Sequence, residues 1–112
     1  MKYCVDKNQE WDIVKEGQIR RKIKAYDKSL MIVEVEFQNG AVGDEHVHVH
    51  EQSSYCLEGS FDYSIEDKIY RLEVGDSIFV DKDLKHGCKL LSEKGRLLDI
   101  FTPYREDFVE EV

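Results

Sequence analysis

Hydrophobic residues recur at every second position along much of the chain, the period that places side chains on one face of a β-strand. Over residues 31–37 these positions are Met31, Val33, Val35 and Phe37. Similar alternation over 61–65 is followed by Glu66-Asp67 and a second apolar stretch over 69–74, which predicts a hairpin. Helical periodicity is nearly absent, and only residues 104–112 are compatible with one or two helical turns.

The second half of the chain adds short apolar stretches separated by turn residues. We expect further strands over 77–80, 86–91 and 96–101, with a loop over 81–85 and a turn at 93–95. Many short strands with regular turns are typical of a sandwich or barrel. We therefore expect an all-β fold with one domain over residues 1–112, since this length supports one hydrophobic core but not two.

Composition and charge limit the classes of partner. No apolar run approaches the roughly 20 residues of a membrane helix, and the first residues lack the apolar stretch of a signal peptide. We therefore expect a soluble cytoplasmic protein without membrane contact. The chain has 24 acidic and 16 basic residues, which argues against nucleic-acid binding. The basic cluster over 20–24 is interpreted as a solvated strand edge protected by charge.

Three of the four histidines lie close together in the sequence. If the segment is one regular strand, alternate side chains project from one face, here those of His46, His48, His50 and Gln52. Neutral imidazole is the commonest metal ligand, so these residues indicate a metal site. His86 follows a turn-rich loop that could return it to the same place. The alternative is a chance surface cluster.

The spacing of these residues resembles the two motifs of the cupin family. The positions that match the first motif are Gly40, His46, His48, Gln52 and Gly59, and those that match the second are Gly75 and His86. In the second motif Asp81, Asp83 and Leu90 replace the usual proline, glycine and asparagine, which is expected to loosen the loop before His86. The resemblance implies a double-stranded β-helix, or jelly-roll barrel, with motif 1 at 40–59 and motif 2 at 75–90.

The resemblance also implies one divalent metal ion, bound by His46, His48, Gln52 and His86. Because Gln52 replaces the glutamate of many cupins, all ligands are neutral and the ion would be a stronger Lewis acid toward an anion. Ni, Zn, Mn and Fe all accept imidazole-rich sites, so the metal stays open. His50 matches no ligand position and is expected at the entrance of the site. Cys88 is expected as a small buried hydrophobe, a thiol ligand being the alternative.

Most of the chain, roughly from Val33 to Phe108, resembles one group of small bacterial cupins. Stretches such as HxHxHEQxSYxLEG and LLDxFxPxREDF occur in cupins of pectin degradation and match residues 46–59 and 97–108. Members of that group convert 4,5-unsaturated monouronates into linear ketonised sugar acids. In that family the Asp, Phe and Arg of the second stretch line the active site. The resemblance implies these roles for Asp99, Phe101 and Arg105.

The chemistry of these three residues is compatible with that role. Asp99 and Phe101 share strand parity, and a carboxylate inside a barrel is costly unless it is paired or catalytic. The planar fork of Arg105 suits a carboxylate. The alternatives are a structural ion pair between Asp99 and Arg105, and Phe101 as ordinary core.

Three functions remain open. They are a metal-dependent non-redox isomerase of uronate-like sugar acids, an Fe(II)-dependent dioxygenase-type cupin, and a non-catalytic module that binds a small anionic molecule. We also expect a twofold homodimer with the apolar residues Trp11, Ile13 and Val14 near its interface.

Overall fold

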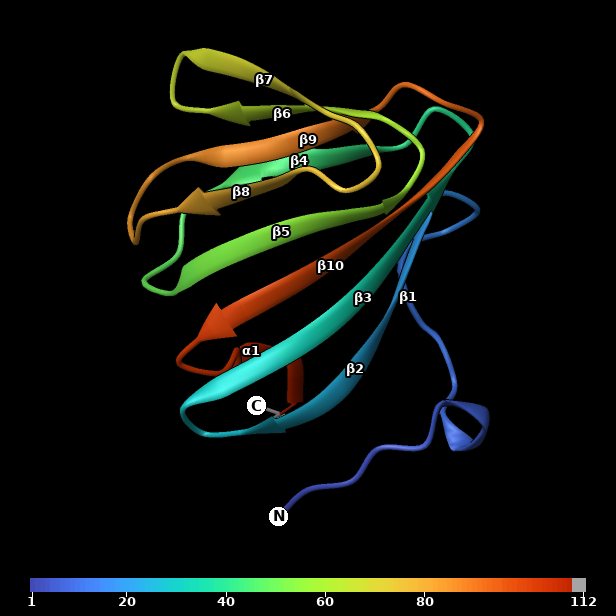
Figure 1. Ribbon diagram of the computed structural model, residues 1–112, viewed down its shortest axis with the longest axis vertical. Coiled ribbons are helices and arrows are strands. Elements are labelled where there is room, and N and C mark those ends of the chain that lie inside the picture. Colours follow the sequence, from blue (N-terminus) through green and yellow to red (C-terminus); the bar gives the residue numbers. More distant parts are fainter. Residues whose placement is uncertain (110–112) are drawn as a thin grey trace.

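The computed structural model describes residues 1–109, and two antiparallel β-sheets form most of it (Figure 1). The larger sheet has the strand order β1-β2-β3-β10-β5-β8, and the smaller sheet β4-β9-β6-β7. The strands are β1 (Asp12–Lys15), β2 (Ile19–Asp27), β3 (Leu30–Gln38), β4 (Val42–His46), β5 (Glu51–Glu58), β6 (Phe61–Ile65), β7 (Lys68–Leu72), β8 (Ser77–Val80), β9 (His86–Leu90) and β10 (Lys94–Thr102). The expected all-β jelly-roll class is confirmed.

Two short helices complete the structure. A 3-10 turn, η1 (Asp6–Asn8), precedes β1, and α1 (Glu106–Val109) follows β10. The helical turn expected over 104–112 is therefore present up to Val109, and residues 110–112 lie outside the described residues. No helix within residues 1–109 is long and apolar enough to cross a membrane.

The basic segment of β2 does not form a sheet edge, so that expectation is wrong. β2 pairs with β1 on one side and with β3 on the other, and β1 is the edge strand. Successive side chains of β2 therefore face opposite sides of the larger sheet. This separates residues that are adjacent in the sequence into an outer set and an inner set.

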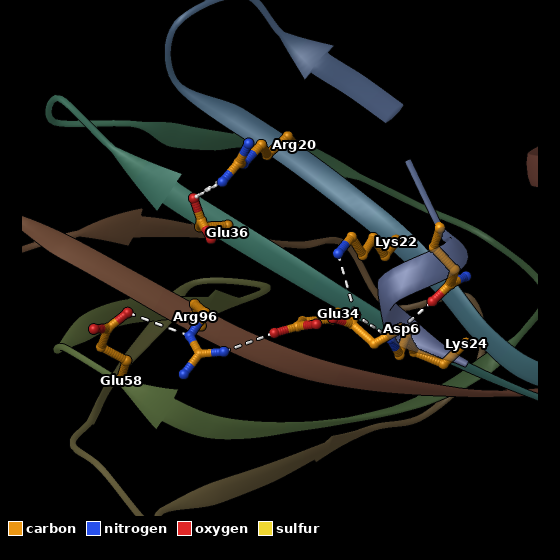
Figure 2. Close-up of polar contacts among 9 residues, drawn as sticks. Asp6, Arg20, Lys22, Lys24, Glu34, Glu36, Glu58 and Arg96 are labelled. Atoms are coloured by element: carbon orange, nitrogen blue, oxygen red, sulfur yellow. Dashed lines mark hydrogen bonds and ion pairs between the residues drawn. The ribbon is translucent and has the colours of Figure 1, made fainter. Parts of the chain in front are cut away.

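The outer set is paired with acidic residues, as Figure 2 shows. An oxygen of Glu36 lies 2.8 Å from Arg20, and one of Asp6 lies 3.1 Å from Lys22 and 2.7 Å from Lys24. Trp11 covers part of this face, with the Arg20 guanidinium carbon 4.1 Å from its ring centroid. The positive charges of Arg20, Lys22 and Lys24 are therefore paired with acidic side chains of the protein. No bound ligand is needed to explain these three basic residues.

The hydrophobic core has two clusters with a cavity of about 350 Å³ lined by members of both. The larger cluster includes Phe37, Phe61 and Leu97. The smaller is built on Met31, Val33 and Phe101 and is covered by the C-terminal residues Tyr104, Phe108 and Val109. The inner faces of the sheets therefore leave room for a small molecule, in the range typical of ligand sites.

Gly87 allows the smaller sheet to place two histidines opposite each other. A Cβ atom at Gly87 would lie 2.7 Å from the carbonyl oxygen of Gly43, because β9 passes very close to β4. The register shifts between Gly43 and His46, and beyond the shift His46 is the register partner of His86.

Candidate metal centre

Three histidines and one glutamine converge, and three of the four, His46, Gln52 and His86, line the cavity. His46 ends β4, His86 begins β9, and His48 lies in the loop between β4 and β5. The ligand nitrogens of these three histidines lie within 4.8 Å of one another. Gln52, near the start of β5, belongs to the other sheet, and its Oε1 atom lies 3.0 Å from His48 Nε2 and 3.2 Å from His86 Nε2. The four side chains named by the motif spacing thus meet in space.

The segment from His46 to Gln52 is not one strand, which corrects the geometry expected from strand parity. β4 ends at His46 and β5 begins at Glu51, so the chain crosses from one sheet to the other between them. His50 consequently leaves the cluster: its ring packs edge-on against His48 and Phe101, with centroid distances of 5.3 and 6.4 Å. Within the described residues, His50 is absent from the group that could hold a metal.

The hydrogen bonds of the histidines fix which nitrogen faces the centre. Each Nδ1 lies 2.9–3.0 Å from a backbone carbonyl oxygen: His46 to Asp44, His48 to His50 and His86 to Leu84. Only a protonated Nδ1 can donate to a carbonyl, so each Nε2 of a neutral ring presents a lone pair. Backbone carbonyls play this orienting role at many metal-bound histidines.

Gln52 presents its oxygen to the same point. Its amide nitrogen donates to Ser54 Oγ at 3.1 Å and to Tyr63 OH at 3.2 Å, which leaves Oε1 directed at the histidines. Three imidazole lone pairs and an amide oxygen therefore face one another with no proton to share. A divalent cation between these atoms would remove the repulsion between their lone pairs. The four residues therefore fit a metal ion of the kind that binds imidazole.

Burial keeps two of these imidazoles neutral. Burial, and then the positive charge of Arg105, lowers the pKa of His48 to about 4. The pKa of His86, which is only 2% exposed, is also lowered, chiefly by burial. Neutral imidazole is the form that binds metal, so the site does not depend on deprotonation at neutral pH.

A chain of hydrogen bonds links Gln52 to Asp99 on the neighbouring strand β10. Ser54 and Asp99 are register partners, and Ser54 Oγ donates to Asp99 Oδ1 at 2.6 Å. Tyr63 OH lies 3.0 Å from the same Ser54 oxygen. Because Ser54 has one proton and gives it to Asp99, it accepts from Tyr63 and Gln52. The network therefore directs its donors toward the Asp99 carboxylate.

Asp99 reaches the cavity but has few groups to stabilise its charge. Burial raises the pKa of Asp99 to about 6, and hydrogen bonds from Ser54 and Gln52 together with the charge of Arg105 offset only part of this. Among residues 1–109 it forms no ion pair, so the expected alternative, a structural pair with Arg105, is not formed. A carboxyl group with a pKa close to neutral can both accept and release a proton.

Arg105 and Phe101 line the same cavity. Arg105, 9% exposed, donates from Nε and Nη2 to the two oxygens of Asp107, at 3.0 and 2.8 Å. Its guanidinium carbon lies 5.1 Å from the Phe101 ring centroid and 4.1 Å from that of Phe108. The segment after β10 thus places the positive charge of Arg105 next to the Phe101 and Phe108 rings, in the cavity that Asp99 also lines.

Sequence reasoning did not single out several residues of this cavity: Arg21, Ser54, Tyr63 and Phe108. Strand parity could have found Ser54, which shares a face with Gln52, and Arg21, which shares a face with Ile19 and Ile23. Cys88 also lines the cavity, and burial raises its thiol pKa to about 12. A protonated thiol is a poor metal ligand, which favours its interpretation as a small hydrophobe.

The fold and the histidine cluster together define a class of protein, and comparison with known proteins agrees. The model of the cupin domain family matches residues 33–101. The chain belongs to the cupin domain family. It is 38% identical over 109 residues to the pectin degradation protein KdgF of Dickeya dadantii (strain 3937), covering 96% of this chain and 98% of that protein.

Two solved structures are similar over nearly the whole chain. KdgF from Halomonas sp. superposes with a TM-score of 0.89 at 34% identity and covers 96% of this chain and 97% of its own. An RmlC-like cupin from Shewanella frigidimarina NCIMB 400 also gives a TM-score of 0.89, at 36% identity, and covers 96% of this chain and 95% of its own.

Proposed function

We propose that this protein is a metal-dependent, non-redox isomerase that opens and ketonises a 4,5-unsaturated uronate or a similar sugar acid. The observation that carries the proposal is Asp99, a cavity carboxyl group whose pKa of about 6 suits proton transfer, linked through Ser54 to the metal-ligand residue Gln52. The similarity to proteins named for pectin degradation supports the substrate class. The absence of an Asp99 ion pair among the described residues favours catalysis over a purely binding role.

The proposed reaction moves one proton and needs no oxidant or reductant. The substrate is a cyclic hemiacetal with a C4=C5 double bond and a carboxylate on C5. When the bond between C1 and the ring oxygen breaks, the C1 hydroxyl loses its proton and C1 becomes an aldehyde. The ring oxygen remains on C5 as an enolate, and transfer of the same proton to C4 gives the ketone. The product is an isomer of the substrate.

The polar residues of the site and Phe101 have the following parts in this scheme. A divalent ion held by His46, His48, Gln52 and His86 would supply Lewis acidity to the oxygen on C5. Asp99 accepts the proton of the C1 hydroxyl and delivers one to C4. Arg105 attracts the carboxylate, and Phe101 forms the wall that excludes water from the ring. The local cation explains how a chain with net charge −8 would bind an anion.

Loss of the conjugated ultraviolet absorbance of 4,5-unsaturated galacturonate tests the proposal directly. We expect enzyme-dependent loss of absorbance without consumption of oxygen. Failure with both galacturonate- and mannuronate-derived substrates would contradict the isomerase function. Oxygen uptake with any sugar acid would favour the dioxygenase alternative, and binding without turnover would favour the binding module.

We also propose that the protein forms a twofold homodimer through the surface near β1. Ile13 and Val14 remain 58% and 49% exposed there, and burying such apolar surface stabilises an interface. We expect light scattering at micromolar concentration to give twice the chain mass of 13.2 kDa. Ile13→Asp should shift the protein toward monomer, whereas Ile69→Asp, at a position on β7 that is 68% exposed, should not. A monomeric wild type would contradict the proposal.

A further inference from the structure

One arginine of the basic segment faces the interior of the barrel. Arg21 alternates with Arg20 and Lys22, whose side chains are paired with acidic groups on the outer face (Figure 2). Arg21 instead lines the cavity that contains Asp99 and the metal-ligand residue Gln52. Its position is fixed by the register of β2 against β3, in which it lies opposite the cavity residue Val35.

The donors of Arg21 are incompletely satisfied. Its Nε atom is buried and has no hydrogen-bond partner within residues 1–109. Its guanidinium carbon lies 3.7 Å from the centroid of the Phe108 ring, which orients the planar group without accepting its Nε–H. Leaving a buried donor of a charged group unpaired is costly, so an acceptor that arrives with a ligand is the simplest account of this arrangement.

Arg105 differs from Arg21 although both lie against Phe108. Two nitrogens of Arg105 already donate to the carboxylate of Asp107. This is the bidentate geometry that a bound carboxylate would otherwise use. Arg105 thus contributes a positive charge with a fixed orientation, whereas Nε of Arg21 has no acceptor within residues 1–109.

We propose that Arg21 binds the carboxylate of the sugar acid directly, and that Arg105, held by Asp107, orients Phe108 and adds positive potential beside it. The inference rests on the proposed function, because it takes the anionic group from that substrate class. The carboxylates of Asp12 on β1 and of Asp107 are the negative charges that act on Arg21. Neither carboxylate forms an ion pair with Arg21 within the described residues. The substrate would then lie between Arg21 and the metal-ligand cluster, with Asp99 beside it.

Two neighbouring arginines provide a matched pair of variants for the test. Arg21→Gln removes the charge inside the cavity, and Arg20→Gln removes the same charge one residue away on the outer face. Kinetics with 4,5-unsaturated galacturonate are measured for both variants and for wild type, with metal retained as isolated. Titration calorimetry compares D-galacturonate with its uncharged methyl ester, so that binding is measured independently of turnover. Circular dichroism and thermal midpoints show whether each variant is folded.

The expected result is selective loss of carboxylate recognition. Arg21→Gln should raise KM about 10- to 100-fold with kcat changed much less, the effect of losing a charge-assisted contact. It should weaken D-galacturonate binding to the level of the methyl ester, while Arg20→Gln should leave both ligands as in wild type. Arg21→Lys should restore only part of the affinity, because an ammonium cannot form the bidentate contact.

The remaining outcomes separate this inference from the proposed reaction. A folded Arg21→Gln variant with wild-type KM and wild-type preference for D-galacturonate would overturn the role of Arg21 alone. Binding of D-galacturonate that depends on Arg21, without turnover of the unsaturated uronate, would overturn the reaction and support the carboxylate site. Wild-type protein that neither binds D-galacturonate nor turns over unsaturated uronates would overturn both.

Discussion

Replacing Asp99 with asparagine should lower turnover of the unsaturated uronate by about 10²- to 10⁴-fold, the usual contribution of a positioned acid–base group. Asparagine keeps an oxygen that can accept the Ser54 hydrogen bond, which is 2.6 Å long in the wild-type protein. It cannot take up or release a proton at neutral pH. The variant should therefore retain the geometry of the cavity and lose the proton-transfer step. Initial rates of absorbance loss measure the effect.

The same substitution should leave the fold intact. Burial already disfavours the charged form of Asp99, as its raised pKa indicates, so a neutral amide removes a cost instead of adding one. We expect an unchanged metal content and a thermal midpoint no lower than that of wild type. Asp62→Asn, which loses a surface pair with Arg71, is the control and should retain full turnover. Wild-type rates for Asp99→Asn would show that Asp99 is structural and that the mechanism is wrong.

Strands with one uniformly apolar inner face were predictable from the sequence. The alternation over 31–37 corresponds to β3, and that over 61–65 to β6, because their inward side chains pack in the core. The pattern fails where a polar side chain of a strand faces the cavity or where the strand lies mostly exposed. In β2 the apolar alternation is broken by Arg21, and in β4 four of the five residues are exposed. These positions of β2 and β4 do not pack in the hydrophobic core, so their residues do not follow the apolar alternation.

The candidate metal-ligand residues were predictable from spacing, but their geometry was not. Strand parity alone would have grouped His50 with them, whereas the crossing between sheets removes it from the cluster. The orientation of the Gln52 amide depends on Tyr63, which lies on a strand of the other sheet. That contact is tertiary, and no local pattern encodes it. Arg105 and Asp107, by contrast, are only two residues apart, but they pair in the segment after β10, which the strand pattern does not cover.

Loss of one ligand should abolish stoichiometric metal binding, and His48 is the ligand best suited to the test. His48 Nε2 lies 3.0 Å from Gln52 Oε1 at the centre of the cluster, yet the side chain is less buried than that of His86. His48→Ala therefore removes a donor without opening a cavity in the core. The matched control is His50→Ala, which deletes a histidine two residues away that lies outside the cluster.

We expect elemental analysis of untagged protein to find about one divalent ion per chain in wild type and in His50→Ala, and little in His48→Ala. Disturbing groups that only support a metal ligand typically costs 10- to 100-fold in affinity, so removing the ligand itself should cost more than about 100-fold. Because a metal bound only by the folded state stabilises it, a chelator should lower the thermal midpoint of wild type and of His50→Ala but not that of His48→Ala. If wild type contains no metal and the chelator changes none of the three midpoints, the convergent lone pairs of His46, His48, Gln52 and His86 do not form a metal site.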